Sequence, residues 1–245
     1  MKLFLELLDQ LQHQLLELAA LVESTIHQGV TAALARDASD SRAVISQQRK
    51  IDELAAGINA FVTDLLALHH PVAGDLALLT ASLKISSDLK RMGELSVNIA
   101  QRSIALSERS PIQFPHGLVE MAHRVQLMVS KSLQAFAQRL EELAAEVITA
   151  DDDVDRLRTA MYGDLVRQME EQPSLAAQEV DLMFIVHNLE RIGDHATNIA
   201  EDVLLFVGGS KNWAPWTEKP TDTKESLDAF PSAPDAAISE RPGLK

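Results

Sequence analysis

The sequence predicts an all-α protein built as a tandem repeat of two antiparallel three-helix bundles, and three observations lead to this prediction. The 245 residues include only ten glycines, nine prolines and 4% aromatic residues, whereas helix-favouring Leu, Ala, Gln and Glu are abundant. Apolar residues recur with a helical period over stretches of about 30 residues, which is typical of long bundle helices. One segment also occurs twice along the chain in similar form, which indicates an internal repeat.

Charge and composition exclude several classes of protein. The 36 acidic residues outnumber the 22 basic ones, and a net charge of −14 disfavours binding to nucleic acid or anionic lipid. The chain has no cysteine, which rules out disulfides, thiolate catalysis and cysteine-based zinc sites. Acidic residues interrupt the first apolar segment, and no stretch reaches the roughly 18 uninterrupted apolar residues of a membrane span. We therefore expect a cytoplasmic protein.

Helix breakers divide the chain into six predicted helices. Prolines, glycines and short polar residues give the following expected helices: Leu3 to Ala35; a second ending at His69 and His70; a third from within residues 72–75 to beyond Ala105; Leu118 to Ile148; a fifth starting at Ala150 behind a Thr149 cap; and a sixth that follows Pro173 and Ser174 and ends at Gly208 and Gly209. Long helices with short connections are typical of antiparallel bundles.

The repeat is clearest in residues 88–101 and 188–201. Their sequences, DLKRMGELSVNIAQ and NLERIGDHATNIAE, match at a constant offset of 100 residues. The preceding helices repeat as well, because Ile51 and Asp52 correspond to Val154 and Asp155. The predicted domains are therefore residues 1–109 and 110–208. Residues 209–245 hold five of the nine prolines and little apolar periodicity, so we predict a disordered tail there.

The last two predicted helices carry an acidic stripe. At about 100° per residue, Glu190, Asp194 and Asn198 fall at roughly 0°, 40° and 80° around the sixth helix. Aliphatic residues occupy the opposite side, so we expect the stripe to face away from the core. On the fifth helix, Asp151 and Asp155 are four residues apart and share a face. Two such helices side by side would bring carboxylates around a cation, since hard and intermediate metals bind oxygen donors.

An acidic stripe is also the ordinary solvated face of a helix, and for an isolated pair of acids this is the commoner interpretation. Two details favour a binding site instead. Like charges four residues apart cost a few tenths of a kcal/mol, and Asn198 adds a neutral oxygen donor that is a poor helix former. Gly193 and its counterpart Gly93 indicate close helix packing. We interpret His187 and His195, which flank the stripe, as histidines without a metal contact.

Residues 188–201 match the signature of the PhoU family, the accessory regulators of phosphate-specific ABC transporters, and the chain resembles that family from about Leu3 to Val207. The duplicated signature, the PVAGDL stretch at residues 71–76 and the Arg36-Asp37 turn carry the resemblance. It implies two three-helix bundles, a homodimer, and clusters of a divalent or trivalent metal such as iron, zinc, manganese or magnesium. It also implies a non-enzymatic negative regulator of phosphate uptake and of the phosphate-starvation response. Such a regulator contacts the transporter's ATPase subunit and the phosphate-sensing histidine kinase, and reaches the membrane only through these proteins.

The resemblance also assigns metal ligands residue by residue. In the second repeat they are Asp151, Asp155, Glu190, Asp194 and Asn198. In the first repeat the family's paired acids correspond to Gln48 with Asp52 and to Lys90 with Glu94, so each pair has lost one carboxylate. Lys90 adds a positive charge where the cation would sit. The weaker candidates in this half are Asp52, Asp75, Glu94 and Asn98.

Two other functions stay open at this stage. A carboxylate-bridged di-iron enzyme is also a helical bundle, but it needs two inward-facing Glu-x-x-His motifs. This chain contains one such motif, at Glu120 and His123. A metal-free helical scaffold is the second alternative, because the first repeat has lost half of its paired acids.

Overall fold

The computed structural model describes residues 2–71 and 73–209, and the regular elements in these ranges are all helical. The first half contains α1 (Lys2–Ala35), α2 (Ala38–His69) and α3 (Ala73–Ser107). The second half contains α4 (Leu118–Gln138), α5 (Glu141–Glu171) and α6 (Ala176–Gly209), with a short 3-10 turn, η1 (Pro173–Leu175), before α6. The predicted disorder of residues 209–245 concerns a segment that, apart from Gly209, lies outside the described residues.

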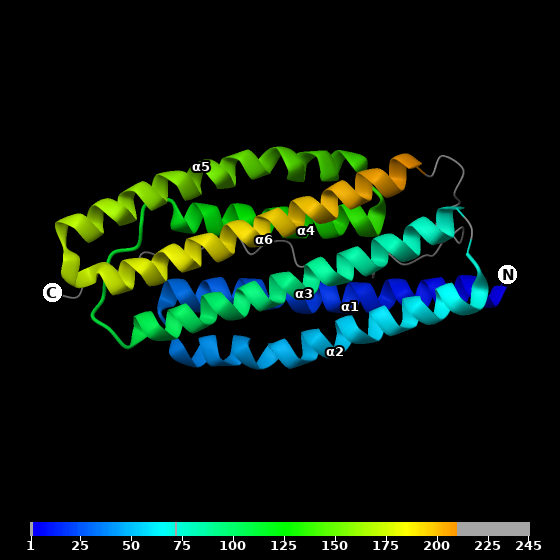
Figure 1. Ribbon diagram of the computed structural model, residues 1–245, viewed down its shortest axis with the longest axis horizontal. Helices are drawn as coiled ribbons and strands as arrows, with labels where there is room; N and C mark the ends of the chain where they lie inside the picture. Colours follow the sequence, from blue (N-terminus) through cyan, green and yellow to red (C-terminus); the bar gives the residue numbers. More distant parts are fainter. Residues whose placement is uncertain (1, 72, 210–245) are drawn as a thin grey trace, which may run out of the picture. The chain divides into compact units, whose positions relative to one another are not determined.

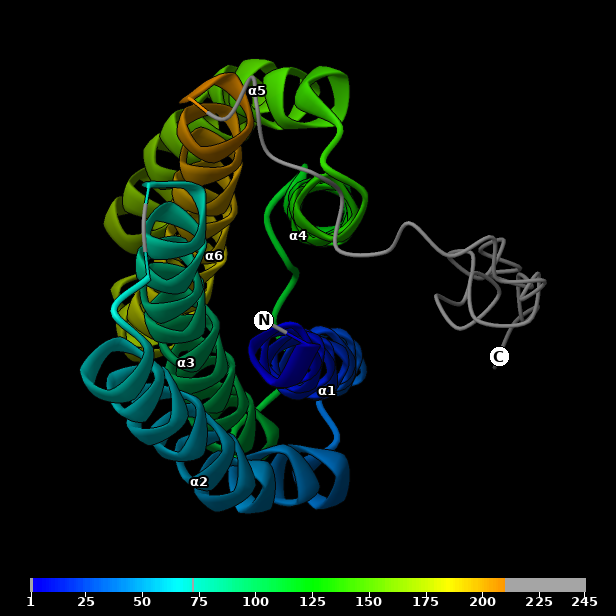
Figure 2. The same cartoon turned by 90° about the vertical axis from the view of Figure 1, so that its right-hand side faces the viewer.

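Helices α3 and α6 lie side by side in the middle of the molecule, with α2 against α3 and α5 against α6 (Figure 1). Helices α1 and α4 lie on the same side of this row of four, each packed against the other helices of its own half (Figure 2). Each half is thus an antiparallel three-helix bundle. The predicted fold class, all-α with two such bundles in tandem, is confirmed.

The core follows directly from the apolar period of the sequence. Along α6 one stripe recurs at alternating steps of three and four residues, and its members are almost completely buried: Leu182, Ile185, Leu189, Ile192, Ala196, Ile199 and Val203. Helix α3 carries the same stripe 100 residues earlier, from Ser82 to Ser103. The serines of this stripe, Ser82, Ser96 and Ser103, donate to backbone carbonyls, as Ser82 does to Leu78 at 2.9 Å. Because burying a Leu or Ile side chain is worth about 1.5–3 kcal/mol, these stripes hold the central helices in place.

The turns between helices also repeat. Arg36 ends α1 and Arg139 ends α4, 103 residues later, and both adopt the left-handed conformation, with φ of 55° and 57°. The Arg36 guanidinium donates to the carbonyls of Arg109 at 3.1 Å and Ser110 at 3.3 Å, which ties the first turn to the end of α3. Asp37 then caps α2 by accepting from the backbone N–H groups of Ser39 and Asp40.

The predicted helix from Leu118 to Ile148 is wrong, because the chain turns at Arg139 and Leu140 and α5 begins at Glu141. Thr149 lies inside α5, where its hydroxyl donates to the Ala145 carbonyl at 2.9 Å instead of capping a helix. Leu140 occupies the N-cap position, but a leucine side chain cannot accept a hydrogen bond. No proline, glycine or short polar residue therefore marks this turn in the sequence.

The two repeat-related glycines differ in how closely the neighbouring helix approaches. A Cβ added to Gly93 would lie 2.8 Å from Ile51 Cδ1 and 3.1 Å from Ile51 Cγ2, so α2 and α3 meet tightly there. A Cβ added to Gly193 would meet Met128, Val125 and Val154 at 3.7 to 3.8 Å, which is ordinary contact. Close packing explains Gly93, and the expectation of close packing at Gly193 is wrong.

Alanine substitution at these glycines should have different effects. We expect Gly193→Ala to raise the free energy of unfolding by up to about 1 kcal/mol, because alanine is the better helix former. Gly93→Ala should lower it relative to Gly193→Ala, since forcing a methyl against the stiff, buried Ile51 costs about 1–3 kcal/mol. Urea unfolding followed by circular dichroism measures both. Equal stability of the two variants would contradict the packing difference.

Glu179 is an acid at a core position. It lies in the first turn of α6 and is 1% exposed, and its counterpart in the first half is the fully buried Leu79. One of its carboxylate oxygens has no hydrogen-bond partner within the described part of the chain. Burial raises the pKa of Glu179 above its ordinary value of 4.5. The folded state therefore binds this proton more tightly than the unfolded state.

Removing this acid should change how stability depends on pH. With a raised folded pKa, the contribution of Glu179 is fully present below the unfolded value and is lost as pH rises through the folded pKa. We expect Glu179→Gln to match the wild type below about pH 4.5 and to exceed it in free energy of unfolding at pH 8.5. Glu170→Gln, at an exposed position of α5, is the control. A difference that does not grow with pH would contradict the burial argument.

Candidate metal centre

The structure gathers four of the predicted ligands where α5 and α6 pack against each other. Asp151 and Asp155 are one turn apart on α5, and Glu190 and Asp194 are one turn apart on α6. Their charges act on one another across the two helices. Asn198 lies one turn beyond Asp194 and is exposed. We call the four carboxylates the second-repeat acid cluster.

The electrostatics of this cluster disfavour its fully charged form. Burial raises the pKa of Asp151, and the charges of Asp194 and Asp155 raise it further. Burial and the charge of Asp194 likewise raise the pKa of Glu190, whereas the Arg158 guanidinium acts in the opposite direction. The repulsion that these carboxylates impose on one another is therefore only partly compensated.

The acidic stripe predicted that Glu190 faces open solvent, and this prediction is wrong. Its side chain turns toward α5, and the residue is only 7% exposed. Arg158 of α5 covers it: the guanidinium donates to Glu190 Oε1 and also lies 3.4 Å from Asp155 Oδ1. Glu190 Oε2 has no hydrogen-bond partner among the residues that the structure describes. Asp194 does face outward, with a side chain 40% exposed.

Arg158 was missed by the sequence analysis, although its position carries a signal. It follows Asp155 by three residues, so both side chains lie on one face of α5. Arg191 makes a longer contact of 3.9 Å with Asp194. Four carboxylates and two guanidinium groups leave a formal charge of −2 on the cluster.

The residues of the second repeat fit a metal in their chemistry, although they are not yet arranged around one. In the described ranges, no three Asp, Glu or His side chains are close enough to hold an ion as they stand. Carboxylates, the Asn198 amide, an unsatisfied Glu190 oxygen and an excess of negative charge are nevertheless what a hard cation binds. A cation entering this cluster would have to take the place of Arg158 beside Glu190.

The flanking histidines have different surroundings. His195 Nδ1 lies 2.8 Å from Asp88 Oδ1, so this ring is directed across the contact between α6 and α3. His187 Nδ1 lies 3.6 Å from Glu190 Oε2, beside the acid cluster. The predicted absence of metal contacts by these histidines stays a prediction.

In the first repeat the structure brings together only Asp52 and Glu94 of the weaker candidates, with Lys90 between them. The grouping of Asp75 with these candidates is wrong. Asp75 precedes Glu94 by 19 residues of the continuous helix α3, so it lies about 28 Å away along the helix axis. Asn98 is directed toward the second half, where its amide donates to Asn188 Oδ1 at 3.4 Å.

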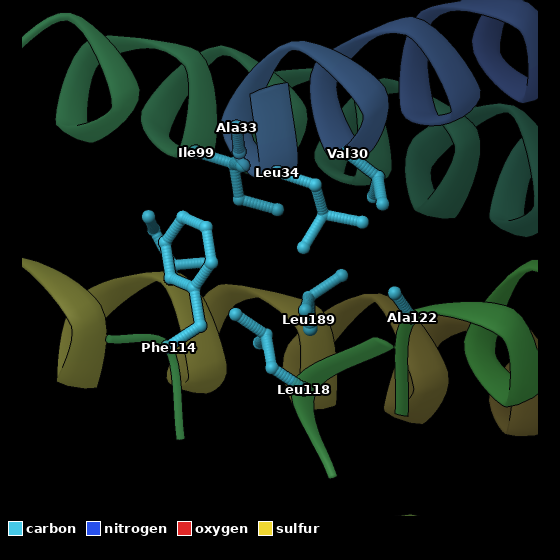
Figure 3. Close-up of a pocket in the computed structure, with 9 residues that line it drawn as sticks. Val30, Ala33, Leu34, Ile99, Phe114, Leu118, Ala122 and Leu189 are labelled. Atoms are coloured by element: carbon cyan, nitrogen blue, oxygen red, sulfur yellow. The ribbon is translucent and has the colours of Figure 1, made fainter. Parts of the chain in front are cut away.

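An apolar cavity lies between the two halves, where α1 and α3 approach α4, α6 and the segment before α4 (Figure 3). Its lining is entirely apolar: Val30, Ala33, Leu34, Ile99, Phe114, Leu118, Ala122, Ile185 and Leu189. A phosphate or metal ion would lose its hydration there without gaining a polar contact. The acid cluster is therefore the better candidate for an ion.

Six antiparallel helices in two sequence-related halves, with a carboxylate cluster on the last two, define a duplicated helical-bundle protein with a candidate cation site. The PhoU domain matches residues 15–103 and again residues 118–203. The chain belongs to the PhoU family.

Curated relatives and solved structures agree with this assignment. The phosphate-specific transport system accessory protein PhoU homologue of Rhizobium meliloti is 31% identical over 227 residues, covering 92% of this chain and 94% of that protein. The homologue of Pseudomonas aeruginosa is 34% identical, covering 83% and 84%. The crystal structure of PhoU from Pseudomonas aeruginosa matches with a TM-score of 0.80 at 33% identity, over 83% of this chain and 98% of that one. The phosphate transport system regulatory protein PhoU from Streptococcus pneumoniae matches with a TM-score of 0.76 at 26% identity, over 82% and 95%.

None of the helices described here combines the length and the apolar character that crossing a bilayer requires.

Proposed function

We propose that this protein is a negative regulator of phosphate uptake and of the phosphate-starvation response. In this proposal it acts in the cytoplasm, as a homodimer, as an adaptor between the ATPase subunit of a phosphate ABC transporter and a phosphate-sensing histidine kinase. Two matches to the PhoU domain, which together span both bundles, carry the proposal. The relatives are named as phosphate transport accessory proteins, and the long helical faces offer extended surfaces for protein partners.

We further propose that a metal organises the second bundle. The support is the second-repeat acid cluster, with its net negative charge and its unsatisfied, buried Glu190 oxygen. The residues that would hold the ion are Asp151, Asp155, Glu190, Asp194 and Asn198. Iron, zinc, manganese and magnesium all accept such oxygen donors. A bound cation would neutralise the carboxylates and link α5 to α6.

The di-iron enzyme is the weaker alternative. Its ligands must face the inside of a bundle, whereas Glu120 and His123 are both exposed on α4. Glu120 is also paired with Arg124 through bonds of 3.0 and 2.8 Å. The lone Glu-x-x-His motif is therefore an ordinary solvated face of α4.

The metal proposal predicts a loss of binding on charge removal. Asp155→Asn combined with Glu190→Gln keeps the shapes of both side chains but removes two negative charges from the cluster. We expect protein purified without chelator to carry less metal in this variant, and we expect added Mn²⁺ to raise its melting temperature less than that of the wild type. Elemental analysis and thermal unfolding measure the two effects.

The matched control changes two acids farther along α5. Asp164→Asn with Glu170→Gln likewise removes two charges, both of them from α5 and at positions outside the cluster. This variant should retain the metal content of the wild type. Equal metal in all three proteins would show that the ligand assignment is wrong and would favour the metal-free scaffold.

The regulatory proposal predicts a phenotype in cells. A strain that lacks the gene should express a phosphate-starvation reporter in phosphate-rich medium, because the kinase is no longer restrained. The wild-type gene should silence the reporter again, and the Asp155→Asn, Glu190→Gln variant should silence it less. Reporter output is the measurement, together with capture of the kinase and the ATPase subunit from cells grown in high and low phosphate.

Each contrary outcome removes a different part of the proposal. An unchanged reporter in the deletion strain would eliminate the regulatory role. Full silencing by a variant that has lost its metal would eliminate the metal requirement and leave a metal-free adaptor. Capture of neither transporter nor kinase would eliminate the proposed partners.

A further inference from the structure

The two halves differ at the positions that correspond to the acid cluster. At the repeat offset of 100 residues, Lys90 stands where the second half has Glu190. At the offset of 103 residues, Gln48 stands where the second half has Asp151. Only Asp52 and Glu94 keep their carboxylates, so at these four positions the first repeat holds two acids where the second holds four.

The Lys90 ammonium lies between these two carboxylates. Its Nζ atom is 3.4 Å from Asp52 Oδ1 on α2 and 3.9 Å from Glu94 Oε1 on its own helix α3. Gln48 Nε2 donates to the same Asp52 oxygen at 3.1 Å. One cationic side chain thus links α2 to α3 at the place where a metal would link α5 to α6.

The charges around this position balance. Arg91 Nη1 lies 2.5 Å from Glu94 Oε2, so two carboxylates meet two cationic side chains and their formal charges cancel. The second-repeat acid cluster keeps a formal charge of −2 after its two arginines are counted. Since the number and charge of oxygen ligands set the affinity for a hard cation, the first repeat lacks both the donors and the net charge that attract one.

We propose that Lys90 is a built-in cation that replaces the metal of the first repeat, so that the chain takes up metal only in its second bundle. This inference rests on the proposed metal site of the second repeat. A divalent ion entering the first repeat would meet two protein carboxylates and a neighbouring ammonium, and like charges repel strongly at such short separations. The family's metal set therefore does not fit the first half of this chain.

The first repeat also lacks a counterpart of Arg158. The residue at that position is the buried Ala55. After replacement of Lys90 by an acid, α2 would therefore offer no basic side chain at the position of Arg158. Lys90 itself is 43% exposed, and a side chain with this much solvent access can be changed without opening a cavity in the core. The site is consequently open to a gain-of-binding test in the intact protein.

The experiment titrates Mn²⁺ into the full chain and follows the free ion by electron paramagnetic resonance. The variant Gln48→Asp, Lys90→Glu restores the acid set of the second repeat, and we expect the Mn²⁺ bound per chain to about double. Lys90→Arg, which keeps the cation, should bind as the wild type does. Circular dichroism confirms that each variant is folded.

Combining the variants separates this inference from the proposed function. With Asp155→Asn and Glu190→Gln present, the otherwise unchanged chain should bind no Mn²⁺, and adding Gln48→Asp with Lys90→Glu should restore binding. The role of Lys90 would be overturned if the Asp155→Asn, Glu190→Gln chain retained Mn²⁺ and lost it on further substitution of Asp52→Asn. It would also be overturned if replacing Lys90 gave no gain in bound Mn²⁺. A wild type without Mn²⁺ that gains it on replacing Lys90 would instead overturn only the metal site proposed for the second repeat.

Discussion

The antiparallel contact between α3 and α6 is the constraint on which the rest of the structure depends. Polar side chains of the two helices pair along this contact, and the residue numbers of the partners increase along α3 while they decrease along α6. Lys84 meets Asp202 at 2.6 Å and Asp88 meets His195 at 2.8 Å. Farther along, Arg102 lies 4.4 Å from the centre of the Phe184 ring. Because α3 and α6 are the corresponding helices of the two repeats, each central helix packs against its counterpart from the other half.

This arrangement imposes an approximate two-fold relation on the pairs along the contact. Shifting Lys84 and Asp202 by the repeat offset gives Phe184 and Arg102, which are themselves in contact. A salt bridge near one end of the α3–α6 contact thus corresponds to a cation–π contact near the other end, and both hold a basic side chain of α3 against α6. The geometry of the duplication has been kept while the chemistry of individual pairs has diverged.

The same relation explains where the two carboxylate sites lie. Because α3 and α6 occupy the middle, α2 and α5 pack on their outer flanks, and the sites form at the α2–α3 and α5–α6 contacts (Figure 1). Neither site lies inside the aliphatic core. The side chains that form them can therefore change sign, as Glu190 and Lys90 show, without altering the stripes that hold the bundle together.

Much of this fold could be predicted from the sequence because the repeat and the apolar period are both strong signals. Each of the six described α-helices has at least one end near a residue that breaks helices for a stated reason, such as Pro71 or Asp37. The turn at Arg139 had no such residue, but the repeat itself would have located it 103 residues after Arg36. The residues around Arg139 do not indicate a turn, whereas those around the corresponding turn at Arg36 in the first half do.

The burial of Glu190 could not be predicted in the same way. A helical wheel gives the direction of a side chain relative to its own helix, and it contains no information on which neighbour folds over it. The long side chain of Arg158 on α5 decides that question, because it reaches across the helix contact and covers Glu190. The candidate site was thus located from the sequence, whereas its state of charge and exposure required the packing of α5 on α6.

Lys90 and Arg158 both reduce the repulsion between carboxylates on adjacent helices, one in each half. Carboxylates held on adjacent helices repel one another, and the cost of that repulsion must be offset by a cation. In the first half, Lys90 and Arg91 offset it completely. In the second half, Arg158 offsets only part of it and is itself held by Glu190 and Asp155. Any cation that enters the second cluster must therefore displace Arg158 from Glu190, and its own bonds to the carboxylates would replace this ion pair between α5 and α6. In the proposed metal-bound state, ion binding would consequently be coupled to the contact between these two helices through a single guanidinium group.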